Sequence, residues 1–240
     1  MWNKIRTLGF TLSILSVLVL LASGLGNRFG VWGFRTGLML FLAAGGIGFA
    51  AAIISVVFLV GARLQASRRD VIRAIAGVAL GLASLTVVMH WKSVASSVPR
   101  INDITTDTEH PPQFIAILPF RTGGVNSAVY GGPSIAAQQR RAYPDIRTKI
   151  LNVPTSRAFQ EASEAARKMC WKTVTSDPKT GRIEATATTF WFGFKDDIVV
   201  RITPEGDKSR VDVRSASRVG LSDIGTNAKR IRIFLRLMNG

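Results

Sequence analysis

The chain has 240 residues, with 31 Lys and Arg against 15 Asp and Glu and a formal net charge of +16. Apolar residues make up 47% of it, which excludes an intrinsically disordered chain, and its single cysteine excludes an intrachain disulfide framework. In the first hundred residues the basic side chains lie outside three apolar blocks. This distribution is typical of a membrane protein and argues against nucleic-acid binding, for which the charge would gather on one folded face.

The three apolar blocks cover residues 5–25, about 37–61 and about 72–89. A helix needs roughly 20 apolar residues to cross the hydrocarbon core, so we expect three transmembrane helices. Arg73 lies just inside the third block, from where its side chain can reach the headgroups. A buried helix of a soluble domain is the alternative for this block.

The first block can also be interpreted as a signal peptide. Lys4 and Arg6 precede the apolar run, and the small residues Ala22, Ser23 and Gly24 lie near its end. We favour an uncleaved helix, because the run is longer than the usual apolar region of about 7–15 residues in a signal peptide. Cleavage would not change the side of the membrane assigned to the C-terminal half.

The basic residues that flank the blocks predict the orientation. The N-terminus and the loop after the second block hold Lys4, Arg6, Arg63, Arg68, Arg69 and Arg73, whereas the opposite side holds Arg28, Arg35, Lys92 and Arg100. Cytoplasmic loops carry the excess of Lys and Arg. We therefore expect a multi-pass protein of a bacterial inner membrane, with a cytoplasmic N-terminus and a periplasmic C-terminal domain.

The third block contains the pattern Gly77-x-x-x-Gly81, which lets a neighbouring helix backbone approach closely. Packing within the three-helix anchor is the interpretation that we favour, because the pattern is common in membrane helices. A homodimer formed through Gly77 and Gly81 is the alternative.

The rest of the chain predicts an α+β domain. We expect an anchor over residues 1–92, a linker and extended irregular arm over 93–154, and the domain core over 155–240. In the core, apolar spacing predicts a helix from Thr155 to about Cys170 and a final helix that begins near Ser222 or Asp223. Alternation of apolar and polar residues predicts strands over 183–191, 198–202 and 211–215, which form an antiparallel meander packed by the two helices.

Several segments of this half carry a family resemblance. They are ITTDTEHPPQF near residues 101–114, YPDI at 143–146, GRIEATATTFWFGFKDDIVVRI at 181–202 and VDVRSASRVGLSDIGTNAKRIRIFL at 211–235. In this order they resemble the family known as domain of unknown function 1499, over roughly residues 99–238. The chain looks like a membrane-attached version found in proteobacteria. The family has no assigned activity, so the resemblance implies a domain boundary and no catalytic residues.

The most suggestive candidate ligand site lies between the last strand and the last helix. It comprises Arg214, Arg218, Ser222, Asp223 and Asn227. A helix N-terminus offers unpaired N–H groups and a positive dipole end, so with Arg218 it can hold a carboxylate or a phosphate. The alternative is structural: Ser222 and Asp223 cap the helix and Arg218 pairs with an acid.

Further charged residues lie on the predicted sheet. Glu184, Arg201, Asp212 and Arg214 are predicted to form a solvated cross-strand ladder, or else a polar face that grips a charged ligand. The pair Asp196-Asp197 is predicted to lie in a turn, because neighbouring strand residues point in opposite directions and rarely share a metal ion.

The aromatic residues Phe190, Trp191, Phe192 and Phe194 form the second candidate. Four aromatic side chains within five residues cannot all face inward on a strand, so part of the segment is expected to be exposed. Exposed apolar patches mark binding surfaces, so this segment is a candidate surface for a partner or for lipid.

Catalytic motifs are absent from the sequence. It contains two histidines, no phosphate loop and no dinucleotide fingerprint, and we expect no metal, no cofactor and no catalytic residues. The sequence therefore favours a membrane-anchored binding or accessory protein of the bacterial envelope, close to anionic lipid. The alternatives are an enzyme with a pocket of Asp196, Asp197, Asp223 and Arg218, and a subunit of a membrane complex.

Overall fold

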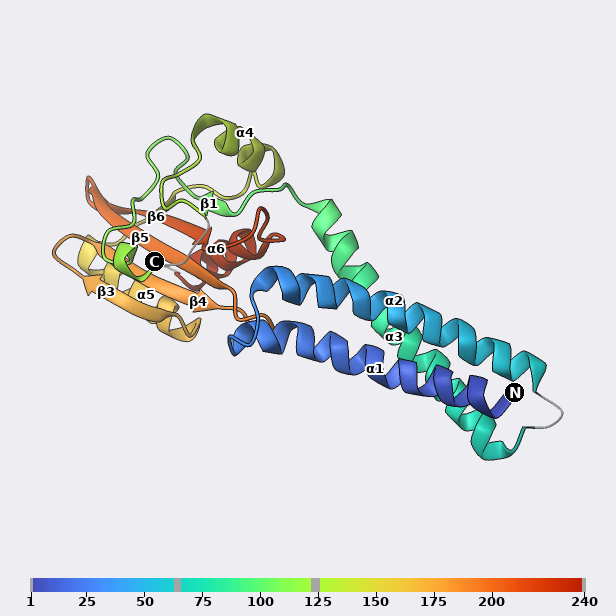
Figure 1. Ribbon diagram of the computed structural model, residues 1–240. Coiled ribbons are helices and arrows are strands. Elements are labelled where there is room, and N and C mark those ends of the chain that lie inside the picture. The colour runs from blue at the N-terminus through green and yellow to red at the C-terminus, as the bar shows by residue number, and fades with distance from the viewer. Residues whose placement is uncertain (1, 63–65, 122–125, 239–240) are drawn as a thin grey trace. The chain divides into compact units, whose positions relative to one another are not determined.

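The computed structural model describes residues 2–62, 66–121 and 126–238, so Arg63 of the orientation rule lies outside the described residues. The chain divides into two compact units (Figure 1). The helical unit comprises Met1–Ser96 together with Phe190–Gly193, and the second unit comprises Ser97–Thr189 together with Phe194–Gly240.

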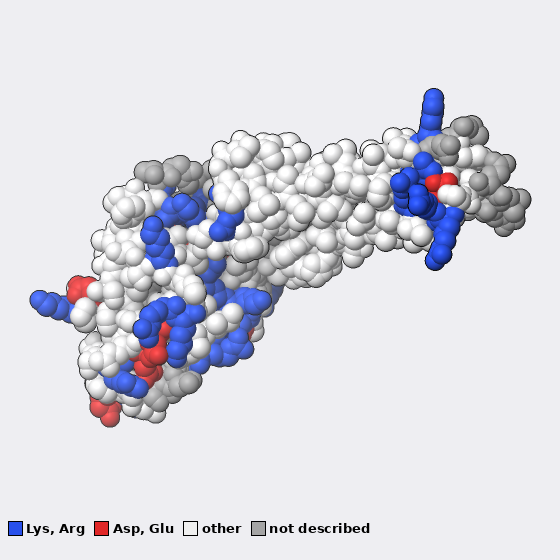
Figure 2. All heavy atoms as spheres, turned by 90° about the horizontal axis from the view of Figure 1, so that it is seen from below, with Lys and Arg blue, Asp and Glu red and all other residues white. Residues whose placement is uncertain are grey.

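Three long helices form the helical unit: α1 (Trp2–Arg28), α2 (Phe34–Gly61) and α3 (Arg68–Ser97). Each is long and apolar enough to span a membrane. Figure 2 shows no charged side chain along the middle of the visible face of this unit, and Lys and Arg gather at the end where α1 begins. At that end Arg6 of α1 forms an ion pair with Asp70 of α3.

Small residues let the three helices approach closely. A Cβ atom added at Gly48 of α2 would lie 2.6 Å from the carbonyl oxygen of Gly81, and one at Gly77 would meet the Ser55 hydroxyl of α2. The hydroxyls of Ser16 in α1 and Ser84 in α3 lie 3.0 Å apart inside the bundle. Both glycines of the Gly77-x-x-x-Gly81 pattern are therefore in contact with α2 of the same chain.

The second unit is built on an antiparallel sheet with the strand order β1-β6-β5-β4-β3, and β2 also pairs with β6. The strands are β1 (Asp103–Thr105), β2 (Lys149–Leu151), β3 (Lys172–Asp177), β4 (Arg182–Thr188), β5 (Lys195–Glu205) and β6 (Lys208–Ser217). Together with the helices of this unit they give the expected α+β fold.

Helices α5 (Thr155–Lys168) and α6 (Thr226–Leu237) cover one face of the sheet. Alternate residues of β4, β5 and β6, such as Ile183, Val200 and Val213, point toward them. Trp171 stacks on Phe234 of α6 with ring centroids 5.1 Å apart, which fills the centre of this core.

The segment between α3 and α5 covers the opposite face. It contains β1, the short 3-10 helix η1 (Leu118–Phe120), α4 (Gly132–Ala142) and β2. Phe114 and Ile117 of this segment pack on Val199 and Ala216 of the sheet. The predicted charged ladder lies beneath it: Glu184, Asp212 and Arg214 are fully buried, so the expectation of a solvated ladder is wrong. The charges are buried because the arm supplies them with partners.

Two local expectations also fail. The first strand ends at Thr188 and does not reach Trp191, because Gly193 at φ +67° turns the chain and Phe190–Gly193 join the helical unit. Asp196 and Asp197 lie within β5 rather than in a turn. A sheet interior tolerates both carboxylates because each has an arginine partner on its own face.

Candidate functional site

Arg214 is the centre of the polar layer between the sheet and the arm. Its side chain is fully buried and donates to both carboxylate oxygens of Asp103, at 2.9 and 2.7 Å. It also donates to the carbonyls of Pro112 and Ala128 and stacks over the ring of Phe114. The ladder of β1 on β6 brings Asp103 next to Arg214, so the guanidinium joins the strand to three points of the arm.

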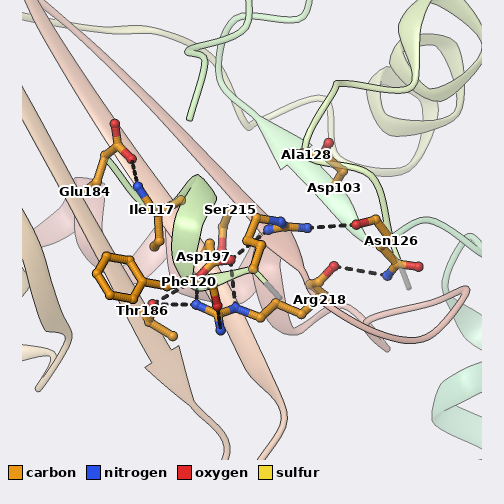
Figure 3. A network of polar contacts seen from close by, with 12 residues as sticks. Asp103, Ile117, Phe120, Asn126, Ala128, Glu184, Thr186, Asp197, Ser215 and Arg218 are labelled. Atoms are coloured by element: carbon orange, nitrogen blue, oxygen red, sulfur yellow. Dashed lines mark hydrogen bonds and ion pairs between the residues drawn. The ribbon is translucent and has the colours of Figure 1, made fainter. Parts of the chain in front are cut away.

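Arg218, the residue expected to hold an external anion, is already bonded to Asp197 (Figure 3). Its Nε and Nη2 atoms donate to the two oxygens of this fully buried carboxylate at 2.9 and 2.8 Å, and Nη1 donates to the carbonyl of Phe120. Thr186 and Arg121 complete the surroundings of Asp197, at 2.9 and 2.7 Å. The structural alternative, in which Arg218 pairs with an acid, describes this arrangement.

A second cluster lies further along the same face. Arg201 and Arg210 each donate to both Asp107 and Asp212, at 2.8 to 2.9 Å. Burial raises the pKa of Asp107, but N–H groups of residues that follow it and the two arginines outweigh burial and lower this pKa overall. The cluster fastens the arm to β5 and β6 with balanced charge.

Glu184 of β4 forms a third attachment. Its carboxylate accepts the backbone N–H of Ile117 at 2.9 Å (Figure 3). It also accepts the backbone N–H of Ile115 at 3.0 Å and lies 3.2 Å from Arg182. Tyr130 of the arm stacks on Arg214, and burial raises the pKa of its hydroxyl to about 12, so it stays protonated at neutral pH.

The remaining predicted ligand residues surround the start of α6. The Asp223 carboxylate accepts the N–H groups of Gly225 and Asn227, and the Ser222 hydroxyl accepts the N–H of Ile224. Fully buried Asn227 bonds Ser215 on the helix-covered face of β6. Burial raises the pKa of Asp223 to about 6.

The five predicted ligand residues therefore do not form one site. Arg214 and Arg218 lie under the arm, whereas Ser222 and Asp223 lie in the turn before α6 and Asn227 lies in its first turn. The pocket of the enzyme alternative is also divided, because Asp196 pairs with Arg230 of α6 while Asp197 points to the arm. No group of three His, Cys, Asp or Glu side chains suited to a metal ion occurs within residues 2–62, 66–121 and 126–238.

The aromatic segment is divided in the same way. Trp191 and Phe192 contact Phe41 of α2, with ring centroids 5.7 and 6.5 Å away, whereas the Phe190 side chain is 87% exposed. Phe194 is half-buried and returns the chain to the second unit, where its N–H donates to the Thr189 hydroxyl at 2.9 Å.

Three important residues of the polar layer were missed from the sequence. Asp103 and Arg121 bind Arg214 and Asp197, and the buried amide of Gln139 bonds both the N–H and the carbonyl of Thr105, as a neighbouring strand would. No local pattern marks them, because their partners are 34 to 111 residues away. Each of the five carboxylates of the layer has an arginine partner, and the layer as a whole holds the arm on the sheet.

Comparison with known proteins agrees with the resemblance of the C-terminal half. The family model described as protein of unknown function (DUF1499) matches residues 103–238, which include the sheet, the arm and α6. No curated protein matches the chain. Since the match covers more than half of the residues, the chain belongs to the DUF1499 family.

Proposed function

We propose that this chain is a membrane-anchored binding or accessory protein of the bacterial envelope, with its DUF1499 domain on the periplasmic side of the inner membrane. The observation that carries the proposal is the mutual neutralisation of the charged residues in the candidate site. Asp197, Asp212 and Glu184 are fully buried and bonded to groups of the chain itself. A general acid or base must reach its substrate, and these carboxylates are enclosed.

The charge distribution supports the orientation and the type of surface. Basic residues of α1 and α3, among them Lys4, Arg68 and Arg69, lie at the end of the anchor assigned to the cytoplasm. Residues 101–240 carry 21 basic and 14 acidic residues, and many of the acids are buried in ion pairs. Each ion pair removes a positive charge together with a negative one, so the excess of basic residues leaves the remaining surface of the domain basic, which favours anionic lipid or an acidic protein surface.

The proposal is tested by purifying the tagged full-length protein from native membranes in mild detergent and identifying bound proteins and lipids by mass spectrometry. Arg214→Ala, which disrupts the domain, and Arg232→Ala, which removes a half-exposed ion pair, form a matched pair of variants. We expect a stoichiometric partner or an enriched anionic lipid with the wild type and with Arg232→Ala, and its loss with Arg214→Ala. A preparation without bound partner or lipid that converts a substrate in an activity screen would contradict the proposal.

A further inference from the structure

The segment Phe190–Gly193 packs against the C-terminal end of α1 and the N-terminal part of α2, a contact that we call the seat. The Trp191 indole N–H donates to the carbonyl of Leu21 at 3.2 Å, and the Asn27 amide donates to the carbonyl of Phe192 at 2.6 Å. A Cβ atom at Gly24 would overlap the Trp191 indole, so this glycine forms the notch that receives the ring. The contacts combine hydrogen bonds and shape, and they hold the segment in one position.

The depth of this seat follows from the helix to which it is bound. The apolar run of α1 ends at residue 25, so Leu21 lies about 6 Å inside it at the rise of an α-helix. Trp191 and Phe192 also pack with Leu20 and Phe41, two further apolar residues of the spanning helices. A side chain that reaches this level has passed the headgroups.

An exposed apolar surface lies beside this seat. Phe190 is 87% exposed, and Phe29 and Val31 in the loop between α1 and α2 are 74% and 71% exposed. The Arg28 guanidinium lies 5.7 Å from the centroid of the Phe190 ring and donates to the Phe190 carbonyl. Aromatic rings accompanied by a cation are characteristic of the boundary between headgroups and acyl chains.

We propose that Phe190, with Phe29 and Val31, inserts into the headgroup–acyl boundary of the membrane leaflet at which α1 ends. The occupant of this surface is lipid because the surface continues the exposed apolar side of α1 at Leu21 and Leu25. The inference rests on the membrane anchor of the proposed function, and it adds a second membrane contact that is far in sequence from the three helices. It holds for either orientation of the anchor.

The test uses the full-length chain in vesicles of phosphatidylcholine and phosphatidylglycerol. In a Cys170→Gly background, a bimane fluorophore is attached to Phe190→Cys, to Phe49→Cys on the exposed side of α2, or to Asp207→Cys in the turn after β5. Asp207 is a charged, exposed residue in the turn between β5 and β6, and it serves as the reference position outside the apolar anchor. Doxyl groups attached near the headgroup or near the middle of the acyl chain serve as quenchers.

We expect the shallow quencher to reduce fluorescence from Phe190→Cys more than the deep quencher does. The deep quencher should act most on Phe49→Cys, and neither should act on Asp207→Cys. If Phe49→Cys is quenched while Phe190→Cys behaves like Asp207→Cys, the lipid contact is overturned and the anchor stands, which would leave Phe190 to a protein partner. If Phe49→Cys is not quenched, the anchor and the inference fail together.

A second pair of variants tests the seat itself. Gly24→Leu fills the notch of Trp191, whereas Gly46→Leu adds a side chain where no atom lies within 4 Å of the new Cβ. Added to Phe190→Cys, Gly24→Leu should abolish the shallow quenching and Gly46→Leu should preserve it. Equal shallow quenching in both variants would support the lipid contact of Phe190 and overturn the role of the Trp191 seat in positioning it.

Discussion

At the scale of single residues, the bidentate ion pairs of arginine with aspartate differ in how deeply they are buried. Arg214 and Asp103 are enclosed by the arm, whereas Arg232 and Asp145 form a similar pair with side chains 39% and 53% exposed. A charge left without its partner in the interior costs far more than one left in water. The same substitution should therefore have very different consequences at the two sites.

Arg214→Ala should lower the free energy of unfolding of the domain by about 3–5 kcal/mol, because Asp103 and two carbonyls lose their donor. Arg232→Ala should lower it by no more than about 1 kcal/mol. Urea unfolding of the full-length protein in detergent, followed by pulse proteolysis, measures both. Equal losses in the two variants would show that the polar layer does not hold the arm.

The raised pKa of Asp223 predicts that the stability of the domain depends on pH. Burial raises its pKa in the folded chain from 3.8 to about 6, so the folded state favours the protonated carboxyl. Its contribution is therefore greatest below about pH 4 and is lost as the pH rises through about 6, by at most about 3 kcal/mol. In Asp223→Asn this dependence should disappear.

The difference in unfolding free energy between the wild type and Asp223→Asn isolates this group from the other titrating residues. Measured by urea unfolding, the wild type should lose stability relative to Asp223→Asn as the pH rises from about 4 to about 7. A difference that stays constant over this interval would mean that Asp223 titrates normally.

The sequence identified the types of residue in the polar layer but not their partners. Arg214 and Arg218 were predicted as ligand residues because they lie near a helix start, a local signal. Their partners Asp103 and Asp197 depend on the pairing of β1 and β5 with β6, which no local pattern specifies. A charged residue on a strand has the same sequence signal whether water or another segment covers it.

At the scale of elements, the end of α5 contains an unusual residue. Cys170 follows the helix with φ +54°, its N–H donates to the carbonyl of Arg167, and the next N–H, from Trp171, donates to Ala166. These two bonds define a Schellman motif, in which glycine is preferred at the left-handed position. Cys170 is exposed at this position.

Cys170→Gly should raise the free energy of unfolding by about 0.5–1 kcal/mol, because glycine adopts positive φ without a clash at Cβ. Cys170→Ala keeps the Cβ atom and should leave the stability nearly unchanged. Chemical unfolding of the two variants side by side decides the question. A gain in both, or in neither, would mean that backbone strain at this position is negligible.

Helix packing in the anchor depends on glycines with different surroundings. In Gly48→Ala the new methyl group would meet the backbone of Gly81, so we expect α2 and α3 to separate and the anchor to lose about 1–3 kcal/mol. Gly46→Ala meets nothing within 4 Å and should be neutral or slightly stabilising. Thermal unfolding in detergent, monitored by helical circular dichroism, tests both. A similar decrease for Gly46→Ala would contradict the close approach of the backbones at Gly48.

Elements with strong periodicity were predictable, and those defined by their neighbours were not. The sequence predicted α5, α6 and the three central strands, since an apolar face recurs along each. The short strands β1 and β2 and the edge strand β3 lack such a face, and α4 begins with a Gly-Pro pair that marks a turn as readily as a helix start. The three strands form because the central sheet offers them hydrogen bonds.

At the scale of the whole molecule, the chain combines an apolar anchor with a domain in which, among the described residues, six acidic side chains are buried: Asp103, Asp107, Glu184, Asp196, Asp197 and Asp212. The three helices were predictable from length and apolar content alone, because a bilayer demands both. The two-sided covering of the sheet was not, since a Pro- and Gly-rich arm carries no periodic signal.

The side of the membrane on which the domain lies can be measured with the native chain. Cys170 is the single cysteine of the sequence, and its thiol is exposed on the DUF1499 domain. A membrane-impermeant maleimide is applied to intact spheroplasts and, in parallel, to lysed ones. As a control for the cytoplasmic side, Arg69→Cys is placed in the Cys170→Gly background at the start of α3, where residue 69 is exposed.

If the anchor is oriented by its basic residues, Cys170 is labelled in intact spheroplasts and Arg69→Cys only after lysis. Labelling of Cys170 only after lysis, with Arg69→Cys labelled in intact spheroplasts, would place the domain in the cytoplasm and contradict a periplasmic binding protein.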